Sequence, residues 1–345
     1  MCVSGNVRGG LMRVLVTGGA GYIGSHVCKA LSQAGFTPIT LDNFSTGNRW
    51  AVRYGPLEYG DLSDPLRLSE VFAAQKPGAV IHCGAASLVG ESMANPALYY
   101  RNNVIGMTHL LEACRAFGVE AFVFSSSCAT YGVPETIPIA ESTPQNPVSP
   151  YGASKLMGER ILADYEMAYG LPTAVLRYFN AAGADVDGEI GERREVETHL
   201  VPLMLEAVLR RRPELKVFGT DYSTPDGSAL RDYVHISDLA DVHVAALRRL
   251  LDGKGSLISN IGTGTPYSVL QLIAAAQDVT GREVPHDLGP RRAGDVPQLS
   301  ADASHFRSLF GEDALARSTI EQIIGSAWRW HLSLHQREPA STTAP

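Results

Sequence analysis

Tyr151 and Lys155 are the residues whose types and spacing point most directly to chemistry. They stand four positions apart, and that spacing places two side chains on one face of a helix. A tyrosine, with an ordinary pKa of about 10, is a weak base at neutral pH. A neighbouring ammonium group would favour the phenolate. The pair therefore suits the removal of a proton from a hydroxyl.

Three serines, Ser125 to Ser127, end the apolar run 121–124 and add hydroxyls to this chemistry. The apolar run predicts a buried strand. A hydroxyl at the end of that strand, with Ser127 as the candidate, can share the proton of a substrate with Tyr151. A Tyr-x-x-x-Lys spacing also arises by chance on protein surfaces. The serines and the surrounding strands are what favour a catalytic interpretation.

A glycine-rich turn at residues 18–24 (GGAGYIG) follows an apolar run and precedes a stretch with helical spacing. In that context the glycines allow a tight turn and a close approach to a pyrophosphate, whose charge meets the helix N-terminus. Two alignments fit the motif, Gly19-Gly21-Gly24 and Gly18-Gly21-Gly24. An ordinary strand-to-helix turn is the alternative, and the flanking elements favour a dinucleotide.

Asp42 ends the second apolar run, about 20 residues after the glycine turn, where a carboxylate grips ribose hydroxyls. A carboxylate there would repel a 2′-phosphate, so NAD is expected rather than NADP. Asp61 follows the third apolar run and has two interpretations. It could accept the adenine amino group, or it could cap the next helix.

The chain alternates strand-like and helix-like segments as far as residue 180. Apolar runs predict strands at residues 14–17, 38–42, 57–59, 79–83, 121–125 and 174–178. Helical spacing of apolar residues covers 25–31, 66–74, 102–117 and 154–169. This alternation predicts an α/β fold with a doubly wound parallel sheet of the Rossmann type.

Beyond residue 180 the pattern changes to glycine, proline and charge, which predicts a smaller C-terminal substrate-binding lobe. We expect an NAD-binding domain at 12–180, with residues 233–261 returning to it as a helix and a strand. The lobe would comprise 181–232, with one helix near 202–211, and 262–335, made of short helices and loops. Residues 1–11 and 336–345 are expected to be a disordered extension and a disordered tail.

The net charge of −7 over 345 residues argues against nucleic acid and anionic membranes as partners. Five cysteines without a CxxC pair indicate neither a disulfide framework nor a zinc site, so no metal is expected. No apolar run has the length of a membrane span, and the first eleven residues lack the apolar core of a signal peptide. A cytoplasmic location is therefore expected.

Several motifs, in order and at matching spacing, resemble the extended short-chain dehydrogenase/reductase family and, within it, the UDP-glucose 4-epimerases. The resemblance runs from Met12 to about Trp330. It is carried by segments 17–26, 90–92, 99–104, 125–127 with 131–132, 151–155, 177–180, 231–235 and 291–295.

The resemblance implies an isomerase that converts UDP-galactose and UDP-glucose reversibly, with tightly bound NAD. Tyr151 would remove the proton of the sugar 4-hydroxyl, with Ser127 as its hydroxyl partner. Lys155 would hold the nicotinamide ribose and adjust Tyr151. A 4-keto sugar would turn over in the pocket, and hydride would return to its other face.

The resemblance also implies two sets of binding residues. The cofactor set is Gly18, Gly21, Tyr22, Ile23, Gly24, Asp42, Asn43, Asp61, Leu62, Asn102, Ser125, Tyr151, Lys155 and Tyr178. The substrate set is Ser127, Tyr151, Asn180, His199, Leu200, Phe218, Arg231, Arg292, Asp295 and Leu299. Two arginines suit a diphosphate, and a carboxylate suits ribose hydroxyls. Each arginine alone would more often form a surface ion pair.

Three positions depart from the family pattern or decide between its members. Ser87 replaces a lysine that supports the NAD phosphates in some members, which predicts weaker retention of the cofactor. Leu299 takes the position that gates sugar size and is intermediate there, so N-acetylhexosamines stay open as substrates. Cys128, after Ser127, is interpreted as a small packed residue, with a reactive thiol as the alternative.

Alternative functions are an epimerase of another UDP-sugar, such as UDP-xylose or UDP-arabinose, a nucleotide-sugar 4,6-dehydratase, and a non-catalytic NAD-sensing module. Cys128 and Ala129 stand where a dehydratase places an acid, which argues against that activity. The resemblance further implies a homodimer formed through helices 102–117 and 154–169. Extra apolar positions in those helices fit it: Met107, Leu110, Leu111 and Met157.

Overall fold

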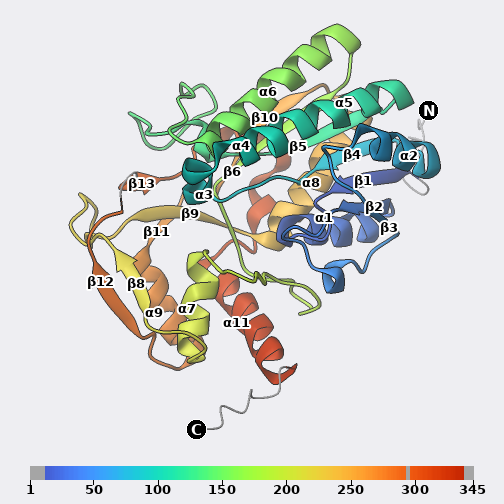
Figure 1. Cartoon of the computed structure of the whole chain (residues 1–345). Helices are drawn as coiled ribbons and strands as arrows, with labels where there is room; N and C mark the ends of the chain where they lie inside the picture. Colours follow the sequence, from blue (N-terminus) through green and yellow to red (C-terminus); the bar gives the residue numbers. More distant parts are fainter. Residues whose placement is uncertain (1–11, 293–295, 338–345) are drawn as a thin grey trace, which may run out of the picture. The chain divides into compact units, whose positions relative to one another are not determined.

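The computed structural model describes residues 12–292 and 296–337, and the chain folds as two units (Figure 1). Among the described residues, the first unit comprises 12–134, 141–178 and 240–260. The second comprises 135–140, 179–239 and the described residues from 261 onward. The expected extension 1–11 lies outside the described residues.

The first unit is built on a seven-stranded sheet whose order is β10-β6-β5-β4-β1-β2-β3. Read from β3, the first six strands have the order 3-2-1-4-5-6 of dinucleotide-binding sheets. The pairings of β1 with β2 and β4, of β2 with β3, and of β5 with β4 and β6 are parallel. The strands are β1 Arg13–Thr17, β2 Thr37–Asp42, β3 Leu57–Tyr59, β4 Ala79–His82, β5 Ala121–Ser127, β6 Thr173–Tyr178 and β10 Leu257–Ile261.

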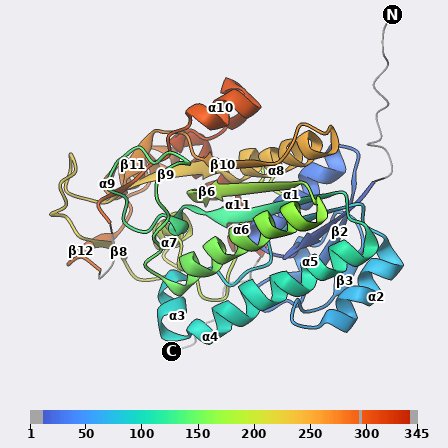
Figure 2. The same cartoon turned by 90° about the horizontal axis from the view of Figure 1, so that it is seen from above.

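Helices α2, α5 and α6 cover one face of this sheet, side by side, as Figure 2 shows. Their apolar side chains and those of the strands form one buried core, in which Leu15, Phe72, Leu110 and Phe122 have no exposed surface. The helices of this unit are α1 Tyr22–Gln33, η2 Arg49–Ala51, α2 Pro65–Gln75, α3 Val89–Ala94, α4 Pro96–Tyr99, η3 Tyr100–Ile105, α5 Gly106–Phe117, η4 Cys128–Thr130, α6 Pro150–Tyr169 and α8 Ile236–Leu251, the last of which begins in the second unit.

Helix α6 begins earlier than its apolar spacing predicts, at Pro150 instead of residue 154. Ser149 caps it by accepting a hydrogen bond from the Gly152 amide, and a proline at the first helical position needs no amide partner. Tyr151 therefore lies in the first turn of the helix. The helix expected at 102–117 is in fact a π-helical turn, η3, followed by α5.

The second unit contains a four-stranded sheet and a two-stranded sheet. In the larger sheet β9 pairs with β11, β13 and β7, and in the smaller β8 pairs with β12. Its strands are β7 Asn180–Ala182, β8 Leu215–Phe218, β9 Leu230–His235, β11 Pro266–Ser268, β12 His286–Gly289 and β13 Gln298–Leu299. Its helices are α7 Leu200–Val208, α9 Val269–Thr280, α10 Ser304–Phe310, η5 Glu312–Leu315 and α11 Ile320–Arg337.

Two expectations for the C-terminal region are wrong. The region after residue 262 contains the long helix α11, which packs its apolar face into the core of the second unit through Ile320, Ile323, Ile324 and Ala327. The same helix reaches Arg337, past the expected start of the tail at residue 336. Residues 338–345 lie outside the described residues.

Burial also corrects the support for a dimer face on α5. Met107, Leu110 and Leu111 have no exposed surface because they pack inward against the sheet of the first unit. Met157 on α6, by contrast, is 42% exposed. Within the described residues, no helix has both the length and the apolar character that crossing a bilayer demands.

Candidate active site

The glycine turn joins β1 to α1 with its backbone closely packed. Gly18 has a φ of 68°, a left-handed conformation that suits glycine, and its amide donates to the Leu41 carbonyl at 2.8 Å. A Cβ on Gly24 would lie 2.1 Å from the Gly18 oxygen. Gly21 is the N-cap of α1, makes no side-chain cap, and no acidic residue follows in the first turn. The N-terminus of α1 is therefore built to meet an anion.

Asp42 braces this turn from the end of β2. One carboxylate oxygen accepts the Ala20 amide at 2.9 Å, and the other accepts the Phe44 amide at 2.8 Å. Burial raises the pKa of this carboxyl, against the lowering effect of both amides. Each carboxylate oxygen has a second lone pair, so the group can also accept from a ribose hydroxyl.

Asp61 does not cap the following helix, so that alternative interpretation is wrong. Asp64 is the N-cap of α2, and its side chain accepts from the Leu66 and Arg67 amides. Asp61 instead accepts from the Asn43 side chain at 2.6 Å and from Ser63. Partial burial works to raise the pKa of Asp61, but these hydrogen bonds outweigh it and lower the pKa. Asn43 and Asp61, both expected cofactor residues, are thus in direct contact.

Lys155 and Tyr151 lie on one face of α6. The Lys155 ammonium donates to the Ser125 carbonyl at 2.8 Å, and its nitrogen is 6.0 Å from the centre of the Tyr151 ring and 4.9 Å from that of Phe124. Burial lowers the pKa of Lys155 to about 8. The ammonium is therefore still charged at neutral pH and stands beside the phenol ring.

Tyr99 packs its ring edge-on against Tyr151, with centroids 6.4 Å apart and planes at 79°. Its hydroxyl accepts the Leu88 amide at 2.9 Å and lies 2.7 Å from the Glu91 carboxylate. Tyr99 and Glu91 fall in the motifs quoted above, but their spacing alone does not reveal that Tyr99 supports the Tyr151 ring.

Ser127 ends β5 opposite Tyr178 of β6. Its hydroxyl oxygen accepts the Ala129 amide at 3.2 Å, and its carbonyl accepts the Thr130 hydroxyl at 3.0 Å. These contacts fix the short helix η4 that follows the strand, so the direction of the Ser127 side chain is determined by its own backbone turn.

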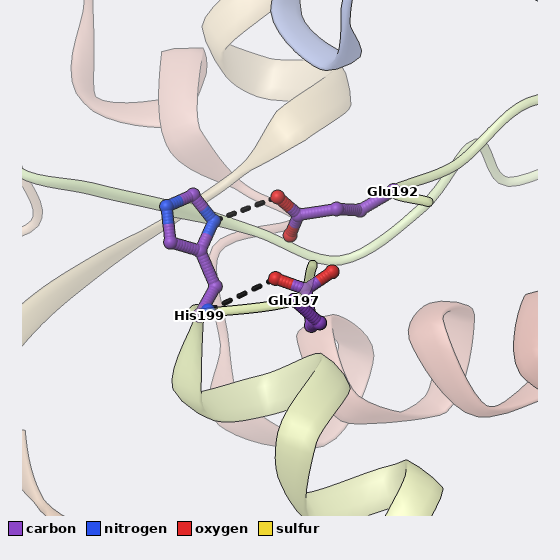
Figure 3. Close-up of side chains that lie close together, drawn as sticks. All are labelled: Glu192, Glu197 and His199. Atoms are coloured by element: carbon purple, nitrogen blue, oxygen red, sulfur yellow. Dashed lines mark hydrogen bonds and ion pairs between the residues drawn. The ribbon is translucent and has the colours of Figure 1, made fainter. Parts of the chain in front are cut away.

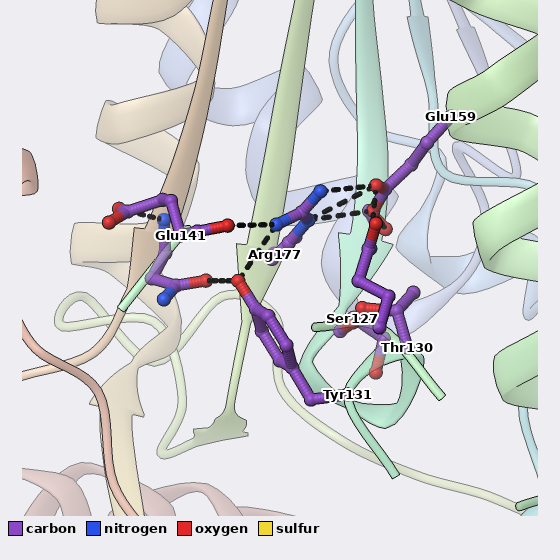
Figure 4. A network of polar contacts seen from close by, with 9 residues as sticks. Ser127, Thr130, Tyr131, Glu141, Glu159 and Arg177 are labelled. Carbon is purple, nitrogen blue, oxygen red and sulfur yellow. Dashed lines mark hydrogen bonds and ion pairs between the residues drawn. The ribbon is translucent and has the colours of Figure 1, made fainter. Parts of the chain in front are cut away.

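A buried polar network anchors strand β5, which ends in Ser127, to α6, as Figure 4 shows. Glu159 accepts the Ser126 hydroxyl at 2.5 Å and is bound by Arg177 through Nε and Nη2. The other terminal nitrogen of Arg177 donates to the Tyr131 hydroxyl at 2.8 Å. Tyr131 in turn donates to the Asn260 side chain at 2.7 Å. The network holds both ends of the Ser127–Tyr131 turn.

The expected cofactor residue Asn102 lies in the π-helical turn η3, a rare feature that is frequent at functional sites. Its side chain donates to Asn103 at 2.8 Å. Asn103, which sequence reasoning missed, donates to the Ala86 carbonyl at 3.0 Å and to the Ser154 hydroxyl at 2.9 Å. Asn103 thus joins the loop after β4 to α6.

Ser125 and Tyr178, also expected cofactor residues, lie on the neighbouring strands β5 and β6, where Ser125 is buried and Tyr178 is half-buried. The Ser125 hydroxyl lies 2.9 Å from Nε2 of His243 and 3.3 Å from the Cys83 sulfur. Burial raises the pKa of Tyr178 well above its usual value. His82, another residue missed from sequence, contacts the Thr17 hydroxyl at 2.6 Å, and burial lowers its pKa to about 3. It therefore stays neutral.

The remaining cofactor residues, Tyr22, Ile23 and Leu62, lie at the first turn of α1 and just before α2. Tyr22 and Ile23 are half-buried, and Leu62 is buried, with its carbonyl 3.2 Å from Nδ1 of His109. Ser87, the departure from the family pattern, is exposed in the loop after β4.

The expected substrate residues that the structure describes, other than Ser127 and Tyr151, belong to the second unit. Asn180 donates from its side chain to the Asp232 carbonyl at 3.0 Å. Leu299 of β13 pairs with Arg231 of β9 in the parallel ladder. Sheet pairing therefore gathers Asn180, Arg231 and Leu299, which are far apart in the sequence.

Phe218 and Arg292 form a second group in the same unit. The Arg292 guanidinium lies over the Phe218 ring, 4.9 Å from its centre, at the end of β8. A flat ring beside an exposed cation suits a ligand that carries both a planar base and an anionic phosphate. Asp295 lies outside the described residues.

His199 is the N-cap of α7, directly before Leu200, and contacts two acids (Figure 3). Its Nδ1 lies 2.7 Å from the Glu192 carboxylate, and its amide donates to Glu197 at 2.9 Å. Donor atoms of the three side chains fall within 4.8 Å of one another, as in metal sites. Arg194 also binds Glu192, so a cation offsets one of the two carboxylates in this cluster.

Comparison with known proteins agrees with this geometry. The model of the NAD dependent epimerase/dehydratase family matches residues 14–262. A UDP-glucose 4-epimerase of Rhizobium leguminosarum bv. trifolii is 49% identical over 94% of this chain and 98% of its own length. One from Lacticaseibacillus casei is 47% identical over 93% of this chain and 97% of its own.

Solved structures give the same result. A UDP-glucose 4-epimerase from Brucella ovis in complex with NAD superimposes with a TM-score of 0.89 at 48% identity, over 92% of this chain and 97% of that one. The UDP-Glc/GlcNAc 4-epimerase of Campylobacter jejuni gives a TM-score of 0.81 at 39% identity, over 93% of this chain and 98% of that one.

Proposed function

Because this chain belongs to the NAD dependent epimerase/dehydratase family, we propose that it interconverts UDP-galactose and UDP-glucose by inverting C4 of the sugar. The chain is an epimerase and therefore an isomerase, with NAD as its cofactor. One observation carries the assignment of the base, namely the Lys155 ammonium 6.0 Å from the centre of the Tyr151 ring.

The residues of the first unit fit NAD. The first turn of α1 offers backbone N–H groups with neither an acidic residue nor a side-chain cap, which suits a pyrophosphate. Asp42 stands where a carboxylate meets ribose hydroxyls and would repel a 2′-phosphate. NAD, when bound, supplies a reversible hydride acceptor.

Tyr151 removes the proton from the sugar 4-hydroxyl. The positive charge of Lys155 favours the phenolate and is present below its pKa of about 8. Ser127, fixed by its turn, hydrogen-bonds the same hydroxyl and then the carbonyl oxygen of the 4-keto sugar. When Tyr151 returns the proton to the C4 oxygen of the inverted sugar, the alcohol is restored and the reaction ends without net oxidation.

The residues of the second unit hold the UDP moiety. Phe218 stacks on the base, and Arg231 and Arg292 bind the diphosphate. Asp295 binds ribose hydroxyls, and Asn180, His199 and Leu200 complete the set. Leu299 borders the sugar and limits its size. Anchoring the nucleotide leaves the keto sugar free to present its other face.

The protein acts as a homodimer in the cytoplasm. Six large apolar side chains are exposed along η3, α5 and α6, and burying them against a second copy would remove them from water: Tyr100, Ile105, Phe117, Met157, Met167 and Tyr169. The cysteines of the described residues are free thiols, as in a reducing compartment. Light scattering on Met157→Glu, expected to shift dimer toward monomer, tests the interface.

The direct test is incubation of the protein with UDP-galactose, without and with added NAD, followed by proton NMR. UDP-glucose without added NAD supports the proposal and shows that cofactor is retained despite Ser87. No product even with added NAD contradicts it. A 4-keto-6-deoxy product would indicate a dehydratase. Faster turnover of UDP-xylose or of a UDP-N-acetylhexosamine than of UDP-galactose would assign that sugar as the preferred substrate.

A further inference from the structure

Three expected substrate residues of the second unit lie on three neighbouring strands. Asn180 begins β7, Arg231 lies in β9, and Leu299 ends β13. In the ladders Asn180 pairs with Tyr233, and Leu299 pairs with Arg231. The relative positions of these three side chains therefore depend on how β7 and β13 are held against β9.

Strand β13 is too short for its own pairing with β9 to fix its position. It has two residues and two register pairs with β9. One further backbone bond, from the Leu230 amide to the Pro297 carbonyl at 2.8 Å, precedes it. On the other side Ile139 exchanges two backbone bonds with the residues just after the strand, at 2.9 and 2.8 Å. A strand this short needs side-chain support to keep its register.

Asp232, next to Arg231, supplies that support from a position with no exposed surface. Its Oδ1 accepts the Thr263 amide at 2.9 Å and the Thr263 hydroxyl at 2.8 Å. Its Oδ2 accepts the Gly264 amide at 3.0 Å and the Ala301 amide at 3.1 Å. Ala301 is two residues beyond Leu299, so the carboxylate fixes the end of β13.

The site is shaped around this one carboxylate. A Cβ on Gly262 would lie 2.7 Å from Oδ2, so glycine leaves room for the acid. All four contacts are donors, which only an ionised carboxylate satisfies completely, since an amide replaces one acceptor with a donor. The backbone carbonyl of the same residue accepts the Asn180 side chain. Asp232 thus binds both strands that flank β9, β13 through the Ala301 amide and β7 through the Asn180 side chain.

We propose that Asp232 is a positioning residue that sets the sugar selectivity of this protein, by holding Leu299 at a fixed distance from Arg231 and Asn180. The proposal rests on the proposed function. A carboxylate that fixes β13 keeps the Leu299 side chain in place against larger sugars. When that hold is loosened, a bulkier sugar gains more affinity than the nucleotide alone, because in the proposed function Leu299 borders the sugar and not the nucleotide.

Calorimetry on the NAD-loaded protein tests this through two dissociation constants, for UDP and for UDP-N-acetylglucosamine. In Asp232→Asn the ratio of the UDP-N-acetylglucosamine constant to the UDP constant should fall about tenfold, the equivalent of one hydrogen bond. Thr263→Ala removes a single contact with less risk to folding. Its ratio should fall in the same direction, about threefold.

Asp238→Asn is the matched control. Asp238 is also buried in the second unit and binds Arg317 and Ser318, away from β13. Its variant should keep the wild-type ratio within about twofold while losing stability. An unchanged ratio in Asp232→Asn and Thr263→Ala, or an equal change in Asp238→Asn, overturns the inference. Wild-type protein that binds both ligands but does not epimerise contradicts only the proposed function. If it binds neither ligand, both ideas fail.

Discussion

Glu159 and Arg177 form a buried ion pair, with Nη2 of the guanidinium 2.6 Å from the Glu159 carboxylate and both side chains 5% exposed. Glu159 follows Lys155 by one helical turn on α6, and Arg177 lies on β6. The same carboxylate binds the Ser126 hydroxyl. One acid therefore ties the helix that carries Tyr151 to the strand that ends in Ser127.

Neutralising this acid should destabilise the first unit strongly. Glu159→Gln leaves the Arg177 charge buried without its partner, which costs about 3–5 kcal/mol of unfolding free energy. Urea unfolding followed by circular dichroism measures the loss. Asp252→Asn, which removes an exposed pair with Lys254 (59% exposed on both sides), should cost less than about 1 kcal/mol. Similar losses in the two variants would show that the buried pair contributes no more to stability than the exposed pair.

Tyr151→Phe should abolish most turnover without loss of binding. Removing the hydroxyl eliminates the general base, and such a group contributes about 10²–10⁴-fold to rate. Coupled assay of kcat with UDP-galactose, together with calorimetry for UDP, separates the two effects. Tyr165→Phe, on the outer part of the same helix with its hydroxyl on Glu112, should keep wild-type turnover. Near wild-type kcat in Tyr151→Phe would exclude it as the base.

Burial of Lys155 should make stability rise with pH in alkaline solution. Its pKa is lowered from 10.5 to about 8, so between these values the unfolded chain binds more protons than the folded one. Stability then increases with pH across that window, by about 3 kcal/mol for the whole shift. Below pH 8 the full cost of burying the charge is present.

The measurement is urea unfolding of the wild type and of Lys155→Met at pH 7.5 and pH 10. The difference in stability between the two proteins should change with pH, because only the wild type gains from deprotonation of Lys155. Other titrating groups are common to both proteins and cancel in the comparison. If the difference stays constant between the two pH values, the lowered pKa of Lys155 is not the cause of the rise in stability.

Gly24→Ala should weaken the retention of NAD. The added Cβ would lie 2.1 Å from the Gly18 carbonyl oxygen, and because that oxygen belongs to the backbone the turn must open. An affinity loss of at least about tenfold is expected, equivalent to 1.4 kcal/mol. Denaturing the purified protein and assaying the released nucleotide measures it. Gly90→Ala, where a Cβ meets nothing within 4 Å, is the control and should retain wild-type NAD.

Features that depend on neighbours in the sequence were determined by the sequence itself. The strand, glycine turn and helix of residues 13–33 follow from local periodicity and from a backbone that only glycine allows at Gly18. The four-residue spacing of Tyr151 and Lys155 places them on one helical face wherever α6 packs. The family motifs are local in the same sense.

Contacts between distant residues were decided only by the tertiary structure. Glu159 meets Arg177 across 18 residues, and Asp232 meets Ala301 across 69, because sheet order and strand register bring them together. Asp61 could be a cap or a ligand from its sequence, and only the fold shows Asp64 in the capping position. The sequence offers Met107 and Leu110 for a dimer face, whereas in the fold both side chains are buried. Such outcomes depend on which side chains share one core, and local spacing carries no information about that.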